Sequence, residues 1–535
     1  MTTDRIGLVD PWTTVGREQA GSEAELVAAR HRVSAFLGAI VDADGGVRRP
    51  CTSRTLESAL LLVLLRRRDS HPKQVSRLAA YLAAPQAQVT RFETALAQAV
   101  LHGRTTTTDV VGDELLADFD HFSLTRKRLL FDVHLAVTGA ISFDQSMLRP
   151  PRTTATDDGA DNSVSWIELI MLSVRVLVAH ALGRAEEISY AEQHRLLALL
   201  GTSRAPVWEN YPMAHLLALL AVDHFAPEHP LVDSGVTALL AGCNPDGGAP
   251  SISGLHVFTT GCTGLALARA KAEPALLCRL CDYLVRQQLP DGGWSFGENM
   301  RHTDMDASSY AAACLATVDP VRHRTTLERA AAYFRGMAGS DGGFPTYIRG
   351  DPSEAGMTGG ALSALPWWEF GPSGLPEDAA RWLLDAQHAD GTFERSWSLS
   401  EANTVWRAMW ALHSLPGPTR TALHRRITAA NAASLRFLAR AQNRDGGWGH
   451  RPGDPSDVTS TCYSLLALSA MGRRPDHDPI VRAGVAHLLS RQDRDGTFTA
   501  PPDQVAPRPL LFDAPVFTDI WVLLALTSCD TDWNW

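Results

Sequence analysis

The sequence is poor in cysteine, has no excess of basic residues and contains no long uncharged hydrophobic run. Eight cysteines are scattered over 535 residues, too few and too dispersed for a disulfide framework, which favours a reducing compartment such as the cytoplasm. The 49 lysine and arginine residues are outnumbered by 59 aspartate and glutamate residues. The resulting formal net charge of −10 argues against a nucleic-acid-binding protein.

Membrane and secretion signals are also lacking. The most apolar long stretch, residues 167–182, carries Glu168 and Arg175 and is too short and too charged to span a bilayer. The first residues, MTTDRIGLVDPW, contain neither a basic nor an apolar signal region. With 45% hydrophobic residues and a mass of 58.0 kDa, we expect a folded, cytoplasmic protein of two domains without stable membrane insertion.

A short repeated segment dominates the rest of the chain. Asp-Gly, followed by Gly or Thr and usually an aromatic residue, recurs six times at intervals of 45 to 55 residues, beginning at positions 246, 291, 341, 390, 445 and 495. Four copies are preceded by a glutamine three residues upstream, at positions 288, 387, 442 and 492. Between the copies, apolar residues recur at three- and four-residue steps, which predicts paired helices.

The predicted fold class is therefore all-α, with no strands and with a ring of seven helix pairs. A period of about fifty residues is typical of repeat architectures in which neighbouring units stack. Residues 149–165 are rich in Pro, Thr, Gly and Asp and indicate an exposed connection. We place a helical domain at 20–150 and a barrel at 160–535, and assign residues 1–20 to the barrel.

Four of the segments resemble the Q-x-x-D-G-x-W repeats of squalene-hopene cyclases, oxidosqualene cyclases and class II diterpene cyclases. They read QLPDGGW (288–294), QNRDGGW (442–448), QHADGTF (387–393) and QDRDGTF (492–498). The resemblance implies two α-barrel domains, β and γ, with the substrate between them. The domain at 20–150 would be γ-like and the barrel β-like. The repeated Gln and Trp would be structural staples between helices, not catalytic groups.

The segment RHTDMDASSYAAACL, residues 301–315, stands where the resemblance implies a D-x-D-D-T motif. Asp304 and Asp306 match its first two acids, whereas Ala307 replaces the third and Ser308 the threonine. Two carboxyl groups in one apolar cavity cannot both ionise cheaply, so one keeps its proton. We predict that Asp306 donates this proton to an alkene and that Asp304 tunes it. The alternative is that both carboxyl groups cap a helix.

The catalytic acid is expected to have a polar partner and aromatic surroundings. In the family, a segment corresponding to SWSLSEANTVWRAMWAL (396–412) supplies a hydrogen bond to the acid, which makes Asn403, and next Ser400, the candidates. Carbocations are attracted to aromatic faces in a dry pocket. The aromatic candidates are Phe296, Tyr310, Phe344, Tyr347, Trp397 and Trp410.

A negatively charged head group would need cations. The γ-like segment HFSLTRKRLLFDVHLAV contains Arg126 and Lys127, and class II diterpene cyclases place a diphosphate-binding lysine in a comparable segment. Arg349 is a further candidate. The same cluster could be a solvated helix face. Mg²⁺ suits a diphosphate, but we place no ligands for it.

One segment matches a metal-binding motif, but we do not interpret it as a metal site. Asp157-Asp158-Gly-Ala-Asp161 matches the D-D-x-x-D motif of class I terpene synthases but lies in the Pro/Thr/Gly-rich connection, where a solvated loop is expected.

Together these features predict a class II terpene cyclase that cyclises farnesyl or geranylgeranyl diphosphate to a bicyclic drimane- or labdane-type diphosphate. Three alternatives stay open. They are a squalene-type triterpene cyclase, a zinc-dependent prenyltransferase subunit using Asp457 and Cys462, and a non-catalytic isoprenoid-binding protein.

Overall fold

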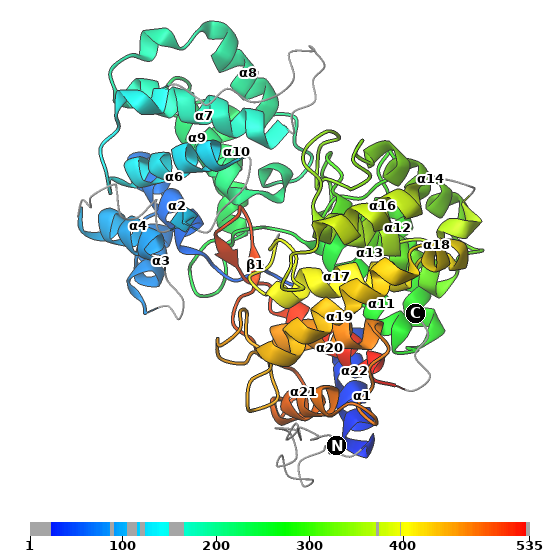
Figure 1. Cartoon of the computed structure of the whole chain (residues 1–535). Helices are drawn as coiled ribbons and strands as arrows, with labels where there is room; N and C mark the ends of the chain where they lie inside the picture. The colour runs from blue at the N-terminus through cyan, green and yellow to red at the C-terminus, as the bar shows by residue number, and fades with distance from the viewer. Residues whose placement is uncertain are drawn as a thin grey trace, which may run out of the picture.

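The computed structural model describes residues 23–85, 90–103, 115–117, 123–148, 165–370, 374–395 and 397–530. The predicted all-α class is confirmed, apart from one small hairpin in which β1 (Gln504–Val505) pairs with β2 (Leu511–Phe512). Within the described ranges, no helix is long and apolar enough to cross a bilayer. The helices form two bodies, with the hairpin between them (Figure 1).

The first body, which we call the small domain, has its own hydrophobic core, built from residues 56–249 together with Leu510 from the turn between β1 and β2. Four of its helices contact one another in the cyclic order α2, α6, α7, α9, and the others pack outside them. Its helices are α2 (Thr55–Arg67), α3 (Pro72–Ala83), α4 (Arg91–His102), α6 (Leu124–Thr138), α7 (Ser165–Ala181), α8 (Tyr190–Leu200), α9 (Pro212–Val222) and α10 (Pro230–Ala241), with the 3₁₀ turns η1 (Gln145–Leu148), η2 (Ala185–Glu187) and η3 (Trp208–Asn210).

The second body, the large domain, is a closed double ring. Six inner helices contact one another in sequence, and the last returns to the first: α11 (His256–Arg269), α13 (Met305–Val318), α15 (Ala355–Ser363), α17 (Glu401–His413), α20 (Val458–Ala470) and α22 (Val516–Ser528). The outer layer comprises α12 (Pro274–Gln287), α14 (Arg324–Met337), α16 (Leu375–Ala386), α19 (His424–Ala441), α21 (Pro479–Ser490) and α1 (Glu23–Ala39), with the short α18 (Gly417–Ala422) and η4 (Trp367–Glu369).

The domain boundaries differ from the prediction. The core of the large domain consists of residues 26–51 and 252–529, so the ring has six helix pairs and is closed by α1 from the N-terminal part of the chain. Helices α7 to α10 belong to the small domain, although the predicted boundary near residue 160 assigned them to the barrel. The prediction failed because helical periodicity is the same in both bodies. The assignment of residues 1–20 lies outside the described residues.

The repeated glutamines join neighbouring outer helices, as the staple interpretation predicts. The Gln288 side chain donates to the carbonyl of Thr326, 2.9 Å away in α14, and Gln442 donates to the carbonyl of Ile480, 2.9 Å away in α21. Gln492 reaches the carbonyl of Ala29 at 3.4 Å, which ties α21 to α1 and closes the ring. The turn itself needs Gly292, whose φ is +96° and whose Cβ would lie 2.3 Å from a backbone oxygen.

The repeat tryptophans fill the space between inner and outer layers, and Trp294 is fully buried. Its indole N–H donates to the carbonyl of Leu284 at 2.7 Å. We expect Trp294→Ala to lower the free energy of unfolding by about 3–5 kcal/mol, because it leaves a cavity and an unpaired carbonyl. Denaturant unfolding measures this loss, with Tyr190→Ala at an 81% exposed position as the control. Equal midpoints for the two variants would refute the staple role.

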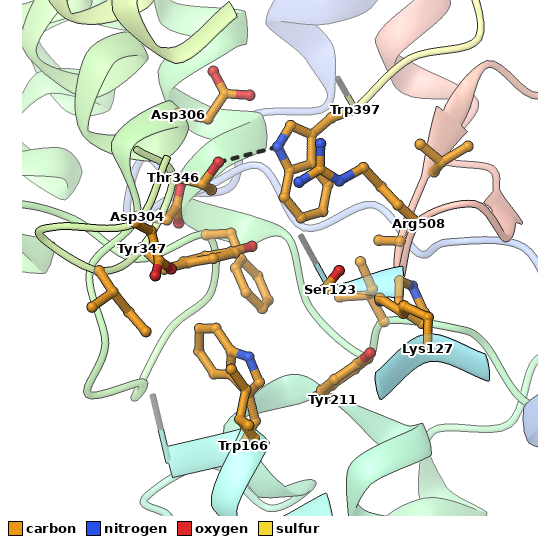
Figure 2. A pocket seen from close by; sticks show the side chains of 18 of the residues that line it. Ser123, Lys127, Trp166, Tyr211, Asp304, Asp306, Thr346, Tyr347, Trp397 and Arg508 are labelled. Carbon is orange, nitrogen blue, oxygen red and sulfur yellow. Dashed lines mark hydrogen bonds between the residues drawn. The ribbon is translucent and has the colours of Figure 1, made fainter. Parts of the chain in front are cut away.

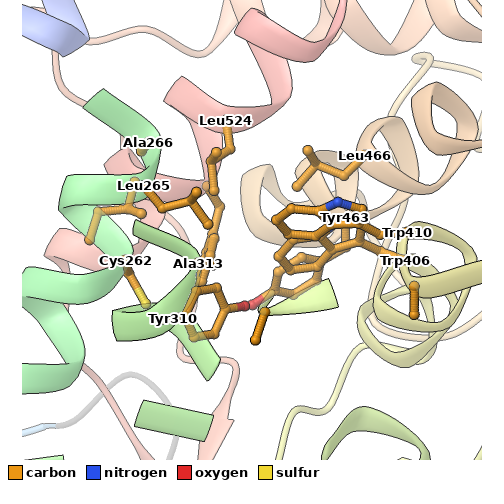
Figure 3. Packing of buried hydrophobic residues seen from close by; sticks show 14 of the residues in the cluster. Cys262, Leu265, Ala266, Tyr310, Ala313, Trp406, Trp410, Tyr463, Leu466 and Leu524 are labelled. Carbon is orange, nitrogen blue, oxygen red and sulfur yellow. The ribbon is translucent and has the colours of Figure 1, made fainter. Parts of the chain in front are cut away.

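The inside of the large ring is packed with aromatic side chains (Figure 3). Trp406 stacks on Trp410 and on Tyr463, with ring centroids 5.7 and 5.6 Å apart. Trp521 meets Trp406 edge-on at 5.5 Å, and Tyr310 lies 5.8 Å from Trp521. The ring axis is therefore filled, so a ligand site must lie at an end of the ring.

Candidate active site

A cavity of about 230 Å³ lies where the two domains and the hairpin meet (Figure 2). The small domain contributes residues of α6, α7 and η3, whereas the large domain contributes the start of α13, the 346–357 segment and the hairpin. Carboxyl groups line the cavity at the start of α13, and cationic groups come from α6 and the hairpin. The cavity thus combines an acidic and a basic region with apolar walls.

Asp304 sits at the N-terminus of α13 and caps it. Its Oδ1 accepts the backbone N–H of Ala307 at 2.7 Å, whereas the buried Oδ2 has no hydrogen-bond partner. Burial raises the pKa of the Asp304 carboxyl to about 8, the Ala307 N–H opposes this rise, and the charge of Asp306 adds to it. Asp304 is therefore both the helix cap of the alternative interpretation and a carboxyl group that keeps its proton at neutral pH.

Asp306 also lines the cavity and forms an ion pair with Arg407 of α17. The Asp306 side chain is 22% exposed and that of Arg407 is 8% exposed. The guanidinium group lies over the ring of Tyr310, 5.6 Å from its centroid. The Asp306 carboxylate thus pairs with Arg407, and its charge contributes to the raised pKa of Asp304.

The predicted polar partners of the acid are elsewhere. Asn403 lies beside the hydroxyl of Tyr463, and Ser400 is buried with its N–H donated to Asp503 at 3.2 Å. Neither residue lines the cavity. The prediction chose the right helix, α17, but the wrong residues, because the side chain that reaches Asp306 starts one helical turn after Asn403.

The basic region is formed by Arg126 and Lys127 on α6 and by Arg508 on the hairpin. The pKa of Lys127 lies well below its usual range, because of burial and because Arg508, Arg126 and Arg54 repel its charge. Arg508 pairs with Glu354 at 3.1 Å and lies 4.4 Å from the ring centroid of Trp397. Within the described part of the chain, Lys127 has no ion-pair partner, so an anion that binds here would stabilise the ammonium form of Lys127.

Arg349 is not part of this region. Its side chain is exposed and does not line the cavity, although its neighbours Ile348 and Asp351 do. Arg126 and Lys127 thus line the cavity together, as predicted. Arg349 does not, and its prediction as a substrate-binding residue is corrected.

The walls between the two regions are largely aromatic. Trp166 of the small domain meets Tyr347 of the large domain edge-on at 4.8 Å, and Tyr347 meets Trp397 at 5.9 Å. Of the aromatic candidates, Phe296, Tyr347 and Trp397 line the cavity. Phe344 is in the hydrophobic core, whereas Tyr310 and Trp410 line a separate cavity of about 20 Å³ behind Arg407. The aromatic lining residues are Trp166, Tyr211, Phe258, Phe296, Tyr347, Trp397 and Phe512.

Several cavity residues were missed from the sequence. Glu209 and Tyr211 come from the segment VWENYP, whose resemblance to the repeats is weak, and Arg508 comes from a proline-rich hairpin that shows no helical periodicity. The D-D-x-x-D segment at 157–161 lies outside the described residues.

The chain is similar to known proteins over most of its length. Residues 253–394 match the prenyltransferase alpha-alpha toroid domain, and residues 377–491 match the squalene-hopene cyclase N-terminal domain. Drimenyl diphosphate synthase from Streptomyces showdoensis is 38% identical over 94% of both chains, and drimenyl diphosphate synthase from Streptantibioticus cattleyicolor is 36% identical over 95% of both. The chain belongs to the class II terpene cyclase family.

The cyclase also shares its fold with a solved relative. ent-Copalyl diphosphate synthase from Streptomyces platensis matches 95% of the cyclase and 99% of its own chain, with a TM-score of 0.56 and 16% identity. The predicted class and enzymatic nature are confirmed. Asp457, the candidate zinc ligand of the prenyltransferase alternative, caps α20 by accepting the Ser460 N–H.

Proposed function

We propose that the cyclase converts farnesyl diphosphate into drimenyl diphosphate by protonating the distal double bond. The observation that carries this proposal is one cavity that is lined by Asp304, whose pKa is raised, and Asp306 at the start of α13, and by the basic side chains Arg126 and Lys127 from α6. The similarity to two drimenyl diphosphate synthases supports a fifteen-carbon substrate.

The residues suggest how the reaction proceeds. The Asp304–Asp306 pair supplies one proton to the distal alkene, and Asp304 is the member of the pair whose pKa is raised, to about 8. The middle and then the proximal double bond attack the resulting cation, which converts two π bonds into two ring σ bonds. Aromatic faces such as Tyr347 and Trp397 stabilise the moving charge. Lys127 and Arg126 hold the diphosphate, which is retained in the product.

The pH dependence follows from the raised pKa of Asp304, which is about 8. The reaction needs the protonated pair, which prevails below this value and is lost above it. We expect turnover at saturating substrate to be level from about pH 6 to 7.5 and to fall about tenfold per pH unit above pH 8. Melting temperatures over the same range provide the control for unfolding. A rate that already falls near pH 4 to 5, as for an ordinary carboxyl group, would contradict the assignment.

Magnesium stays a prediction. Mg²⁺ is usually held by one or two carboxylates together with substrate phosphate oxygens. Asp351 lines the cavity and faces the charge of Arg126, so we propose that this carboxylate would contact an ion that enters with the diphosphate. Activity titrated with EDTA and then with Mg²⁺ tests this proposal.

The substrate is tested by incubating the purified protein with farnesyl diphosphate, geranylgeranyl diphosphate and squalene. After phosphatase treatment, mass spectrometry should show a bicyclic fifteen-carbon alcohol from the first substrate. Recovery of only acyclic farnesol would contradict the proposed function, and a bicyclic twenty-carbon alcohol as the main product would correct its substrate.

A further inference from the structure

Glu209 adopts a backbone conformation that is unusual for its residue type. It lies in η3 with φ 45° and ψ 34°, and Asn210 follows with φ 52°. Two consecutive residues other than glycine in the left-handed region are a source of backbone strain. Hydrogen bonds hold this conformation, since the Glu209 N–H donates to the Ser203 hydroxyl at 3.0 Å and the Asn210 side chain donates to the carbonyl of Glu298 at 2.9 Å.

The strained turn carries a carboxylate into the wall of the cavity. Glu209 has no solvent-exposed surface and is one of the lining residues. Its Oε2 accepts the backbone N–H of Arg301 at 3.0 Å. Its Oε1 accepts no hydrogen bond, although the Arg301 guanidinium lies 3.5 Å away. Buried carboxylate oxygens normally have a donor, so this spare lone pair calls for a functional explanation.

The other carboxyl groups of the cavity already have a partner or a role. Asp304 and Asp306 form the initiating pair. Glu354 accepts from the Thr346 hydroxyl with one oxygen and pairs with Arg508 through the other. Asp351 faces Arg126 in the basic region. Among the described residues of the cavity wall, two buried carboxylate oxygens have no hydrogen bond, Oδ2 of Asp304 in the initiating pair and Oε1 of Glu209.

We propose that Glu209 is the catalytic base that ends the cyclisation, an inference that rests on the proposed function. The bicyclic cation carries its charge on a tertiary ring carbon. A C–H bond on a neighbouring carbon breaks, its electron pair becomes the ring double bond, and its proton passes to Glu209 Oε1. The acid pair has added one proton and Glu209 has removed one, so the overall reaction is an isomerisation. Exchange with solvent restores both groups.

The environment of Glu209 suits this role. Burial raises the pKa of its carboxyl above the usual value, which makes the ionised form a stronger base, whereas the N–H and the charge of Arg301 keep that form accessible. Glu209 also belongs to the small domain, whereas the acid pair is on α13 of the large domain. Protonation and deprotonation are thus assigned to groups on separate elements.

Glu209→Gln is the informative substitution. The amide oxygen can still accept the Arg301 N–H, but the side chain can no longer take up a proton. We expect turnover to fall about 100-fold. The product should change from one alkene to a mixture in which hydroxylated drimane diphosphate and isomeric alkenes make up most of the material, since the cation persists until water or another base reaches it. Glu209→Asp should restore part of the original product ratio.

Asp519→Asn is the matched control. Asp519 is another buried carboxyl group whose pKa is raised, to about 7, but it accepts the Phe498 N–H and does not line the cavity. We expect its product ratio to be that of the wild type. The ratio is independent of the folded fraction, because unfolded protein makes no product.

Two outcomes would overturn the inference. One is a single wild-type alkene from Glu209→Gln, and the other is complete loss of turnover in folded variant protein. Should neither Glu209 variant fold, the wild type itself decides, because the hydroxylated fraction must rise as Glu209 is protonated at low pH and a constant fraction refutes the base. Failure of the wild type to form any bicycle would refute the proposed function instead.

Discussion

Asparagine in place of either Asp304 or Asp306 is expected to lower cyclisation at least about 1,000-fold, a loss of more than about 4 kcal/mol in transition-state stabilisation. Asparagine has nearly the same shape and remains a good helix cap, so at position 304 it can still accept the Ala307 N–H. At position 304 asparagine lacks a transferable proton, and at position 306 it lacks the carboxylate that pairs with Arg407 and whose charge raises the pKa of Asp304. Turnover of farnesyl diphosphate at saturation, followed by mass spectrometry, measures the loss.

The structure offers a matched control in Asp457. This residue caps α20 by accepting the Ser460 N–H at 2.7 Å, as Asp304 caps α13. Its backbone forms an antiparallel β-bridge with Trp448, as the backbone of Asp304 does with Trp294. Burial also raises the pKa of Asp457, to about 6, yet the residue does not line the cavity. We expect Asp457→Asn to keep turnover within about threefold. Equal losses at positions 304 and 457 would show that capping, not proton transfer, explains the effect.

The second large effect is expected at Lys127. Lys127→Met removes a charge-assisted contact to the diphosphate, each of which contributes about 1.5–3 kcal/mol, so KM should rise about 100-fold. The melting temperature should stay level or rise. The substitution removes an amine whose charged form is disfavoured by burial and by the charges of Arg508, Arg126 and Arg54. Inorganic pyrophosphate should inhibit the wild type competitively and the variant only weakly.

Arg128 provides the control for this prediction, since it lies on the same helix but is exposed and does not line the cavity. Arg128→Met should change KM less than twofold. If the two variants behaved alike, the solvated-helix interpretation of the basic segment would hold.

The features that could be predicted from the sequence are those that depend on a few neighbouring residues. The Asp-Gly segments recur at a fixed period because each forms the same left-handed turn, as at Gly292, and they identified the helical ring. The Asp304–Asp306 pair was found because both acids lie within three residues, and Lys127 because a cation on α6 has a counterpart in related proteins.

What could not be predicted depends on contacts between distant segments. Arg407 and Asp306 are 101 residues apart, and Gln492 reaches α1 across 463 residues. Periodicity describes one face of a helix but not which ring the helix joins, which is why α1 and α7–α10 were assigned to the wrong domain. The strained turn at Glu209 has no local signal, because a glutamate seldom adopts that conformation.

Reaction of farnesyl diphosphate in deuterated water tests proton-initiated cyclisation most directly. We expect every bicyclic product molecule to carry one deuterium on the ring carbon that was the distal alkene carbon, and no such product from Asp306→Asn. A bicyclic product without deuterium at that carbon, or one formed undiminished by Asp306→Asn, would contradict the assignment of the Asp304–Asp306 pair as the acid.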